Sequence, residues 1–250
     1  MRQGRVVSLA VLSMLLIGAS VFAAGTPAGT QIVNQATATY TDQNGVSQTA
    51  ASNEVITEVS QVCGLTILPN GSESLPGQSQ GAAPGNTVYF SYTLTNTGNG
   101  PDTYKLQLVN STSSDDFDPD SGAVYLDTNG NGLVDPGEPQ LTNGFSGYGS
   151  VSPTVAADGQ IKLIVSYHIP ATATDGQVTK VNLIGQSQAC TTHPEDNDNW
   201  NQTTVTEDAN VTATKSATPT SVDPGDTITY TISGSNTGNK AAKSVVVTYD

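Results

Sequence analysis

Cationic residues are scarce in this 250-residue chain. It has 8 lysines and arginines against 22 aspartates and glutamates, for a formal net charge of −14, and both arginines, Arg2 and Arg5, lie at the N-terminus. Nucleic acids and anionic membranes are bound through clustered cations. We therefore expect neither as a partner, and metal cations are the natural counter-ions of such an acidic chain.

Residues that commonly perform catalysis are also few, with two histidines, two cysteines and one tryptophan. The sequence has no zinc-ligand spacing, no G-x-S-x-G nucleophile motif and no glycine-rich phosphate loop with a lysine. His168 and His193 are interpreted as surface histidines, and Trp200 as a packing anchor, because a single aromatic residue makes no stacking platform. We expect no enzymatic activity.

Long hydrophobic runs are absent after residue 24. Before it, the apolar run Val6–Phe22 follows Arg2 and Arg5 and ends at Ala23-Ala24. This pattern predicts a secretory signal peptide, residues 1–24. An uncleaved membrane anchor is the alternative, although the run is slightly short for a span. We expect an exported protein at the cell surface or outside the cell, of bacterial type, with no membrane span in its mature chain.

Two cysteines, Cys63 and Cys190, remain in a chain expected to reach an oxidising compartment. Such a pair favours a disulfide over two free thiols. A bridge that closes so long a loop contributes about 4–5 kcal/mol in the chain-entropy model.

A repeated stretch organises the rest of the chain. Pro84–Leu108 has a second version starting at Pro224, and both contain Pro-Gly, an alternating apolar strand and Asn-Thr-Gly-Asn, at 96–99 and 236–239. Alternation with one apolar face is typical of a half-buried antiparallel strand. Gly98 and Gly100 are expected to supply a positive φ at the turn that follows. After the corresponding turn of the second copy we expect a strand whose inward-facing residues are Val245, Val247 and Tyr249.

The abundance of glycine, proline, serine and threonine predicts an all-β fold. We expect tandem immunoglobulin-like β-sandwich domains, the second truncated, after an N-terminal β-hairpin segment whose turn is marked by Asn44-Gly45. A lone hairpin is marginal in water, so this one should pack on the next domain or on a neighbouring molecule. The predicted segments are 25–62 (hairpin), 63–190 (sandwich of about seven strands, with a loop at 69–83), 191–208 (acidic linker or late edge hairpin) and 209–250 (second domain).

The second copy carries a family resemblance. The residues that carry the resemblance are Val211–Lys215, Pro219, Pro224–Thr227 and Asn236–Asn239. With them, the sequence of the second copy resembles the bacterial and archaeal surface repeat catalogued as domain of unknown function 11. The first copy resembles the same broad immunoglobulin-like class less closely, because it has a long insertion and no lysine before its first proline. The resemblance implies a repetitive β-sandwich protein of the cell envelope without known catalysis, and it assigns no functional residues.

The sharpest motif is Asp127–Glu138, which meets every fixed position of the EF-hand calcium loop, with Gly132 at the sixth. No helix is expected beside it. It is similar to the calcium loops of B-type repeats in serine-aspartate-repeat adhesins, which implies a loop between β-strands. We predict a structural Ca²⁺ site here, the alternative being a turn rich in glycine and asparagine. The predicted ligands are Asp127, Asn129, Asn131, Leu133, Asp135 and Glu138.

A second acidic cluster precedes this loop. It is interpreted as a solvated loop, with a weaker ion site or an extra ligand for the same ion as the alternative. Its members are Asp115, Asp116, Asp118 and Asp120.

These features predict an exported, calcium-stabilised repeat protein with a structural or adhesive role in the bacterial envelope. Its expected partners are other envelope proteins, glycans or further copies of itself. The alternative is a glycan- or protein-binding module of an exported multidomain protein, with a hydrolase domain beyond residue 250. Few residues follow Pro224, so the second domain is expected to be completed by further chain or by a strand of a neighbouring molecule.

Overall fold

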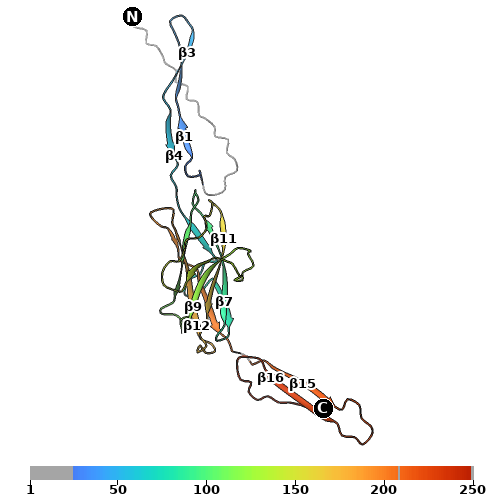
Figure 1. Ribbon diagram of the computed structural model, residues 1–250. Coiled ribbons are helices and arrows are strands. Elements are labelled where there is room, and N and C mark those ends of the chain that lie inside the picture. Colours follow the sequence, from blue (N-terminus) through green and yellow to red (C-terminus); the bar gives the residue numbers. More distant parts are fainter. Residues whose placement is uncertain (1–24, 208, 249–250) are drawn as a thin grey trace.

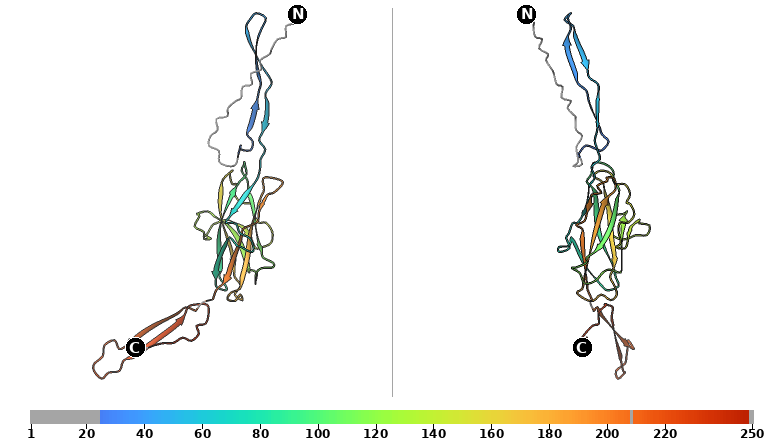
Figure 2. Two further views of the ribbon diagram at one scale, coloured as in Figure 1. Left: turned by 180° about the vertical axis from the view of Figure 1, so that it is seen from behind. Right: turned by 90° about the vertical axis from the view of Figure 1, so that its left-hand side faces the viewer.

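The computed structural model describes residues 25–207 and 209–248. Within them the chain forms strands and turns, arranged end to end as a two-stranded ribbon, a β-sandwich and a second hairpin (Figure 1). Figure 2 shows that the ribbon and the hairpin project from opposite ends of the sandwich. The predicted signal peptide, residues 1–24, lies outside the described residues. In the described part of the chain no helix is long and apolar enough to cross a membrane.

The N-terminal ribbon is an antiparallel hairpin made of two successive strand pairs. The turn forms where the sequence predicts it, and the Asp42 carboxylate accepts hydrogen bonds from the backbone N–H groups of Asn44 and Val46. Every residue in its four strands is exposed, so these strands do not pack on the sandwich. The pairs are β1 (Gln31–Asn34) with β4 (Val55–Glu58), and β2 (Thr37–Thr41) with β3 (Ser47–Ala51).

One sheet of the sandwich is antiparallel throughout and has β11 at its centre. The alternation of β7 (Thr87–Asn96) places Val88, Phe90, Tyr92 and Leu94 against the other sheet, as the alternating apolar pattern predicts. Its strands, in spatial order, are β10 (Gln140–Asn143), β9 (Ser121–Asp127), β11 (Gln160–His168), β7 (Thr87–Asn96) and β5 (Leu65–Leu68).

The second sheet is organised around β12 (Val178–Ser187). On one side β12 pairs with β8 (Tyr104–Asn110), and on the other with β13 (Glu195–Asp196) and β14 (Trp200–Val205). β6 (Gln78–Ala82) pairs in parallel with the outer side of β14. The core between the two sheets is apolar and confirms the predicted all-β sandwich.

Of the two interpretations of 191–208, the acidic linker is wrong and the late edge hairpin is nearer to the structure, because β14 pairs antiparallel with β12. The prediction of a loop throughout 69–83 is also wrong, because β6 forms within it. Both segments add strands to the second sheet, so the sandwich extends to Val205 and has ten strands, β5–β14, rather than about seven. The side chains that β14 turns inward include Asn201 and Thr203, both 0% exposed. An inward face this polar gives no apolar alternation, which is why the sequence does not reveal the strand.

Two tyrosines from the opposite sheet make this polar face possible. The Tyr167 hydroxyl lies 2.8 Å from both Asn201 Oδ1 and Thr203 Oγ1, and Asn201 Nδ2 donates to the Tyr92 hydroxyl at 3.0 Å. Burial raises the pKa of Tyr92 to about 12 and that of Tyr167 further, so both hydroxyls stay protonated. The buried polar groups are thus satisfied across the two sheets.

Cys63 and Cys190 form the predicted disulfide, with their Cα atoms 6.0 Å apart. Cys63 lies just before β5, and Cys190 lies shortly after β12, so the bridge joins the first strand of one sheet to the central strand of the other. It lies at the end of the sandwich from which the ribbon emerges.

The second copy of the repeat begins with an antiparallel hairpin of β15 (Val211–Thr218) and β16 (Thr229–Asn236). The strand predicted around Val245 and Val247 does not form within the described residues, and both side chains are exposed. Tyr249, predicted to face inward with them, lies outside the described residues. Unlike their counterparts in the first copy, Val245 and Val247 have no opposing sheet within residues 209–248 against which a strand would be stabilised.

Candidate metal centre

The predicted calcium loop connects β9 to β10, both strands of the first sheet, and Asp127 is the last residue of β9. The loop lies against the outer face of that sheet, because a Cβ atom on Gly132 would come within 2.9 Å of Ser91 Oγ on β7. Ser91 pairs with Ile164, which faces outward and yet is fully buried. We infer that the loop covers this apolar residue, so the loop closes part of the fold as well as connecting two strands.

Asp127 fixes the first half of the loop. The residue is 7% exposed, and its carboxylate accepts hydrogen bonds from the backbone N–H groups of Gly130 at 2.6 Å and Gly132 at 2.9 Å. Both glycines have a positive φ, 74° and 76°, which other residues adopt at a cost. The sharp turn expected at Gly132 is therefore present.

Asn129 and Asn131 turn their side chains towards Asp135. Their Nδ2 groups donate to the same carboxylate oxygen, Asp135 Oδ2, at 2.7 and 2.6 Å. Their Oδ1 atoms accept the backbone N–H groups of Asn131 and Leu133, respectively. Three of the predicted ligand side chains thus meet at one point.

Glu138 closes the loop from its far end. Its carboxylate accepts hydrogen bonds from the backbone N–H of Thr128 at 2.8 Å and from that of Asp135 at 3.1 Å. The five predicted side-chain ligands therefore belong to one compact hydrogen-bonded loop. The sixth predicted ligand is the backbone carbonyl of Leu133, whose side chain is 57% exposed.

This donor set fits a hard cation. Two polarised N–H groups converge on the Asp135 carboxylate, and rotating either amide would present an oxygen to an ion in their place. Calcium is bound by mixed sets of carboxylate, amide and carbonyl oxygens. Among the residues that the structure describes, no group of three or more Asp, Glu, His or Cys side chains is close enough to hold a metal. Calcium binding here stays a prediction.

The second acidic cluster does not converge on one point. Asp116 accepts the backbone N–H of Val178 at 2.8 Å, whereas Asp120 Oδ2 lies 3.2 Å from His168 Nδ1. Burial raises the pKa of Asp115, and the charge of Asp118 raises it further. These carboxylates serve separate local contacts.

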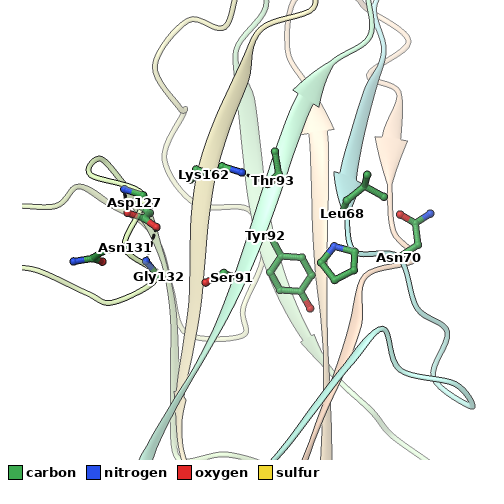
Figure 3. Close-up of a pocket in the computed structure, with 11 residues that line it drawn as sticks. Leu68, Asn70, Ser91, Tyr92, Thr93, Asp127, Asn131, Gly132 and Lys162 are labelled. Carbon is green, nitrogen blue, oxygen red and sulfur yellow. Dashed lines mark hydrogen bonds between the residues drawn. The ribbon is translucent and has the colours of Figure 1, made fainter.

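A depression of about 610 Å³ lies between the metal loop and the segment that follows β5 (Figure 3). Its floor includes Ser91, Thr93 and Lys162, and the Lys162 ammonium donates to Thr93 Oγ1 at 2.7 Å. The one aromatic residue in its lining is Tyr92, whose hydroxyl is bonded within the core. This lining presents neither an aromatic platform for a glycan nor a nucleophile paired with a base.

The histidines and the tryptophan take structural positions. His168 Nε2 lies 3.0 Å from the carbonyl of Gly85, and His193 Nδ1 lies 2.9 Å from that of Ser187. Trp200 is half-buried in β14, where its backbone accepts the N–H of Gly77. Trp200 thus lies in a strand of the sandwich itself.

The Asn-Thr-Gly-Asn motif builds the same turn in both copies. The Oδ1 atom of its first asparagine accepts the glycine N–H, and its Nδ2 donates to a carbonyl four residues ahead, at Gly100 or Lys240. Gly98 and Gly100 do not adopt the positive φ that we expected. A Cβ at Gly98 would instead lie 2.5 Å from the carbonyl oxygen of Val62, so glycine is required for close approach.

The second asparagine of the motif holds the segment that precedes each copy. Asn99 Nδ2 donates to the carbonyls of Thr26 and Ser60, both at 3.1 Å, and Asn239 Nδ2 donates to that of Thr206 at 3.2 Å. The motif therefore joins each repeat to what comes before it. Its recurrence in the sequence signals this role, but the sequence does not show which segment it contacts.

The chain matches no protein-family model and no curated protein. Among solved structures it is similar to a family 123 glycoside hydrolase from Clostridium perfringens, at 10% identity and a TM-score of 0.35, over 57% of this chain and 27% of that one. A putative membrane anchored protein from Corynebacterium diphtheriae matches at 15% identity and a TM-score of 0.26, over 70% and 45%. The major subunit of aggregative adherence fimbriae type I from Escherichia coli matches at 8% and 0.24, over 58% and 95%. Likeness this weak assigns neither family nor function.

Proposed function

We propose that this protein is an exported structural spacer of the bacterial cell envelope, built from β-sandwich repeats and stabilised by calcium. The observation that carries the proposal is the Asp127–Glu138 loop, whose five predicted side-chain ligands form one hydrogen-bonded unit against the outer face of the sheet. A bound Ca²⁺ would offset two of the three negative charges of this loop and fix the loop over Ile164.

Two further observations support a surface spacer. The Cys63–Cys190 disulfide suits an oxidising compartment outside the cytoplasm. The ribbon, the sandwich and the hairpin follow one another end to end, a shape suited to spanning distance (Figure 2). We propose no catalytic role, and the acidic surface favours cations over nucleic acid or anionic lipid.

Thermal melting tests the calcium part of the proposal. A ligand that binds only the folded state stabilises it by RT ln(1 + [L]/Kd), about 2.7 kcal/mol at a hundredfold excess over Kd. We expect calcium to raise the melting temperature of the sandwich and a chelator to reverse the rise. Asp127→Ala combined with Glu138→Ala should remove this response.

Asp118→Ala is the matched control, because Asp118 is an exposed carboxylate of the same sandwich outside the loop. It should leave the calcium response intact. A response lost in Asp118→Ala but retained in the loop variant would assign calcium to the other acidic cluster. A wild-type melting temperature indifferent to both calcium and chelator would leave the loop as a turn.

A further inference from the structure

The N-terminal ribbon begins with the same turn that precedes β12 in the sandwich. Each turn contains a glycine with a positive φ, Gly29 at 78° and Gly176 at 85°. The glycine donates its N–H to the carbonyl of a valine, and the N–H of that valine donates to the carbonyl of the residue after the glycine. The distances agree closely: Gly29 N to Val59 O 2.8 Å and Val59 N to Thr30 O 2.9 Å, against Gly176 N to Val205 O 2.9 Å and Val205 N to Gln177 O 2.8 Å.

The strand registers that follow these turns also agree. In the ribbon Gln31 pairs with Glu58 and Ile32 with Thr57; in the sandwich Val178 pairs with Thr204 and Thr179 with Thr203. Each hairpin is then held by the second asparagine of the Asn-Thr-Gly-Asn turn, Asn99 at Ser60 and Asn239 at Thr206. The ribbon therefore precedes the first repeat in the same way that the β12–β14 hairpin precedes the second repeat. It has the structure of the last hairpin of a repeat.

In the complete sandwich that last hairpin packs face to face on the first one, β5–β7. Asn201 on β14 bonds the hydroxyl of Tyr92 on β7, and a Cβ on Gly185 of β12 would lie 2.6 Å from Ile67 Cδ1 on β5. Val55 holds the ribbon position that corresponds to Asn201. It is 58% exposed, and Ile32 on the same face is 53% exposed. Within the described residues no first hairpin covers this face.

The β15–β16 hairpin is the first hairpin of a repeat, and its core face is exposed. Its opposite face consists of serines and threonines only, as expected for the side turned to solvent. The core-face residues that correspond to Leu65, Val88, Phe90 and Tyr92 of the first copy are Val211, Ile228, Tyr230 and Ile232, all 38–47% exposed.

We propose that the ribbon of one copy of this chain and the β15–β16 hairpin of a second copy pack together, so that the two copies share a repeat and join head to tail. The last and first hairpins of a repeat meet in this arrangement, as they do within the sandwich. The two segments carry net charges of opposite sign, which favours their encounter: residues 25–62 contain Asp42, Glu54 and Glu58 and no cation, whereas residues 209–248 contain three of the six lysines and two aspartates. The association is independent of the calcium loop.

Cross-linking between two single-cysteine variants tests the proposal. Both natural cysteines are in the disulfide, so an introduced cysteine is the only free thiol. Val55 corresponds to Asn201 and Ile232 corresponds to Tyr92, two residues that are in contact within the sandwich. Chains with Val55→Cys are mixed with chains that carry Ile232→Cys, and the mixture is treated with a short bismaleimide. We expect heterodimers to form, and the mass of unmodified protein in sedimentation to rise with concentration.

Ile56→Cys provides the matched control, because Ile56 is equally exposed, at 55%, but lies on the other face of the ribbon. Its cross-linking to Ile232→Cys should be several-fold weaker than that of Val55→Cys. Equal yields from the two ribbon positions, efficient cross-linking of Val55→Cys to itself, or a chain that stays monomeric at all concentrations would each overturn the proposal. The double variant Ile32→Asp with Val55→Asp should abolish association while the sandwich melts at an unchanged temperature.

Discussion

Asn99 and Asn239 make the same contact at two different junctions of the chain. Asn99 binds the carbonyl of Ser60 below the ribbon, and Asn239 binds that of Thr206 below β14. At the second junction Lys240 adds an ion pair with Asp175, at 2.8 Å between Nζ and Oδ2. The repeated motif thus encodes a joint between successive units, which a spacer needs if it is to keep its length.

Asn99→Ala should loosen the joint between ribbon and sandwich. The change removes the hydrogen bonds of Asn99 to the backbone of Thr26, Ser60 and Val62, each of them worth about 0.5–1.5 kcal/mol. We expect faster amide exchange and faster proteolysis around residues 60–62, with the melting temperature of the sandwich unchanged. Asn53→Ala should show neither effect, because Asn53 is an exposed ribbon residue whose side chain donates to the carbonyl of its neighbour Glu54. Equal cleavage in both variants would contradict this role for Asn99.

Removing the disulfide should lower the stability of the sandwich. The bridge closes a separation of 127 residues, and the loop-entropy model assigns such a loop about 4–5 kcal/mol. Cys63→Ser with Cys190→Ser should therefore melt well below the wild type, and the reduced wild type should behave like the variant. A double variant that unfolds at the same denaturant concentration as the oxidised wild type would show that the bridge contributes nothing.

Asn201→Ala should destabilise the core although it removes a polar residue. It would remove the hydrogen bonds of Asn201 to the almost fully buried hydroxyls of Tyr92 and Tyr167. Tyr92 keeps the carbonyl of Asn199 and Tyr167 keeps the Thr203 hydroxyl, so the cost is that of the lost bonds, about 0.5–1.5 kcal/mol each. Gln202→Ala is the natural comparison, because Gln202 is the next residue of β14 and its side chain points the other way. Chemical denaturation should show a clear loss for Asn201→Ala and little for Gln202→Ala. Equal losses would mean that the tyrosine hydroxyls do not depend on Asn201.

Glu73 should contribute to the acid sensitivity of the fold. Hydrogen bonds from the hydroxyls of Ser111 and Ser114 lower the pKa of its carboxyl below the ordinary value of 4.5. A carboxyl whose folded-state pKa is lowered stabilises the protein above its unfolded pKa, and this contribution disappears as the pH falls through the folded-state pKa. Glu73→Gln keeps an oxygen as acceptor for both hydroxyls but removes the negative charge. The melting temperature of this variant should therefore be below that of the wild type at pH 7, and the two values should converge towards pH 3. Parallel pH profiles would contradict this.

The sequence predicts those parts of the fold whose signal is local. The alternation in β7 places Val88 to Leu94 correctly, Asn44-Gly45 marks the ribbon turn, and an even pair of cysteines in a chain that we expect to be exported predicts its own bridge. β14 is missed because its buried Asn201 and Thr203 depend on tyrosines of the opposite sheet. No pattern within one segment can report a partner that folding brings from elsewhere.

The candidate metal site also has a part that the sequence predicts and a part that only the structure shows. The spacing from Asp127 to Glu138 predicts the loop and its turn at Gly132, because every ligand lies within twelve consecutive residues. The alternation of β11 places Ile164 on the solvent side, and its complete burial is known only from the three-dimensional structure. Likewise, the sequences around Gly29 and Gly176 have little in common. The ribbon is recognised as equivalent to the β12–β14 hairpin only from the hydrogen bonds of the two turns.

Direct calcium titration of the mature protein tests the central claim most closely. Isothermal titration calorimetry of metal-free protein should show one Ca²⁺ site per chain. Its Kd should lie within or below the range of about 10⁻⁴–10⁻³ M that is typical of extracellular modules. The same titration of the Asp127→Ala, Glu138→Ala variant should show that site lost. A wild-type protein that takes up no calcium at millimolar concentrations, or a variant that binds it as well as the wild type, would contradict the account.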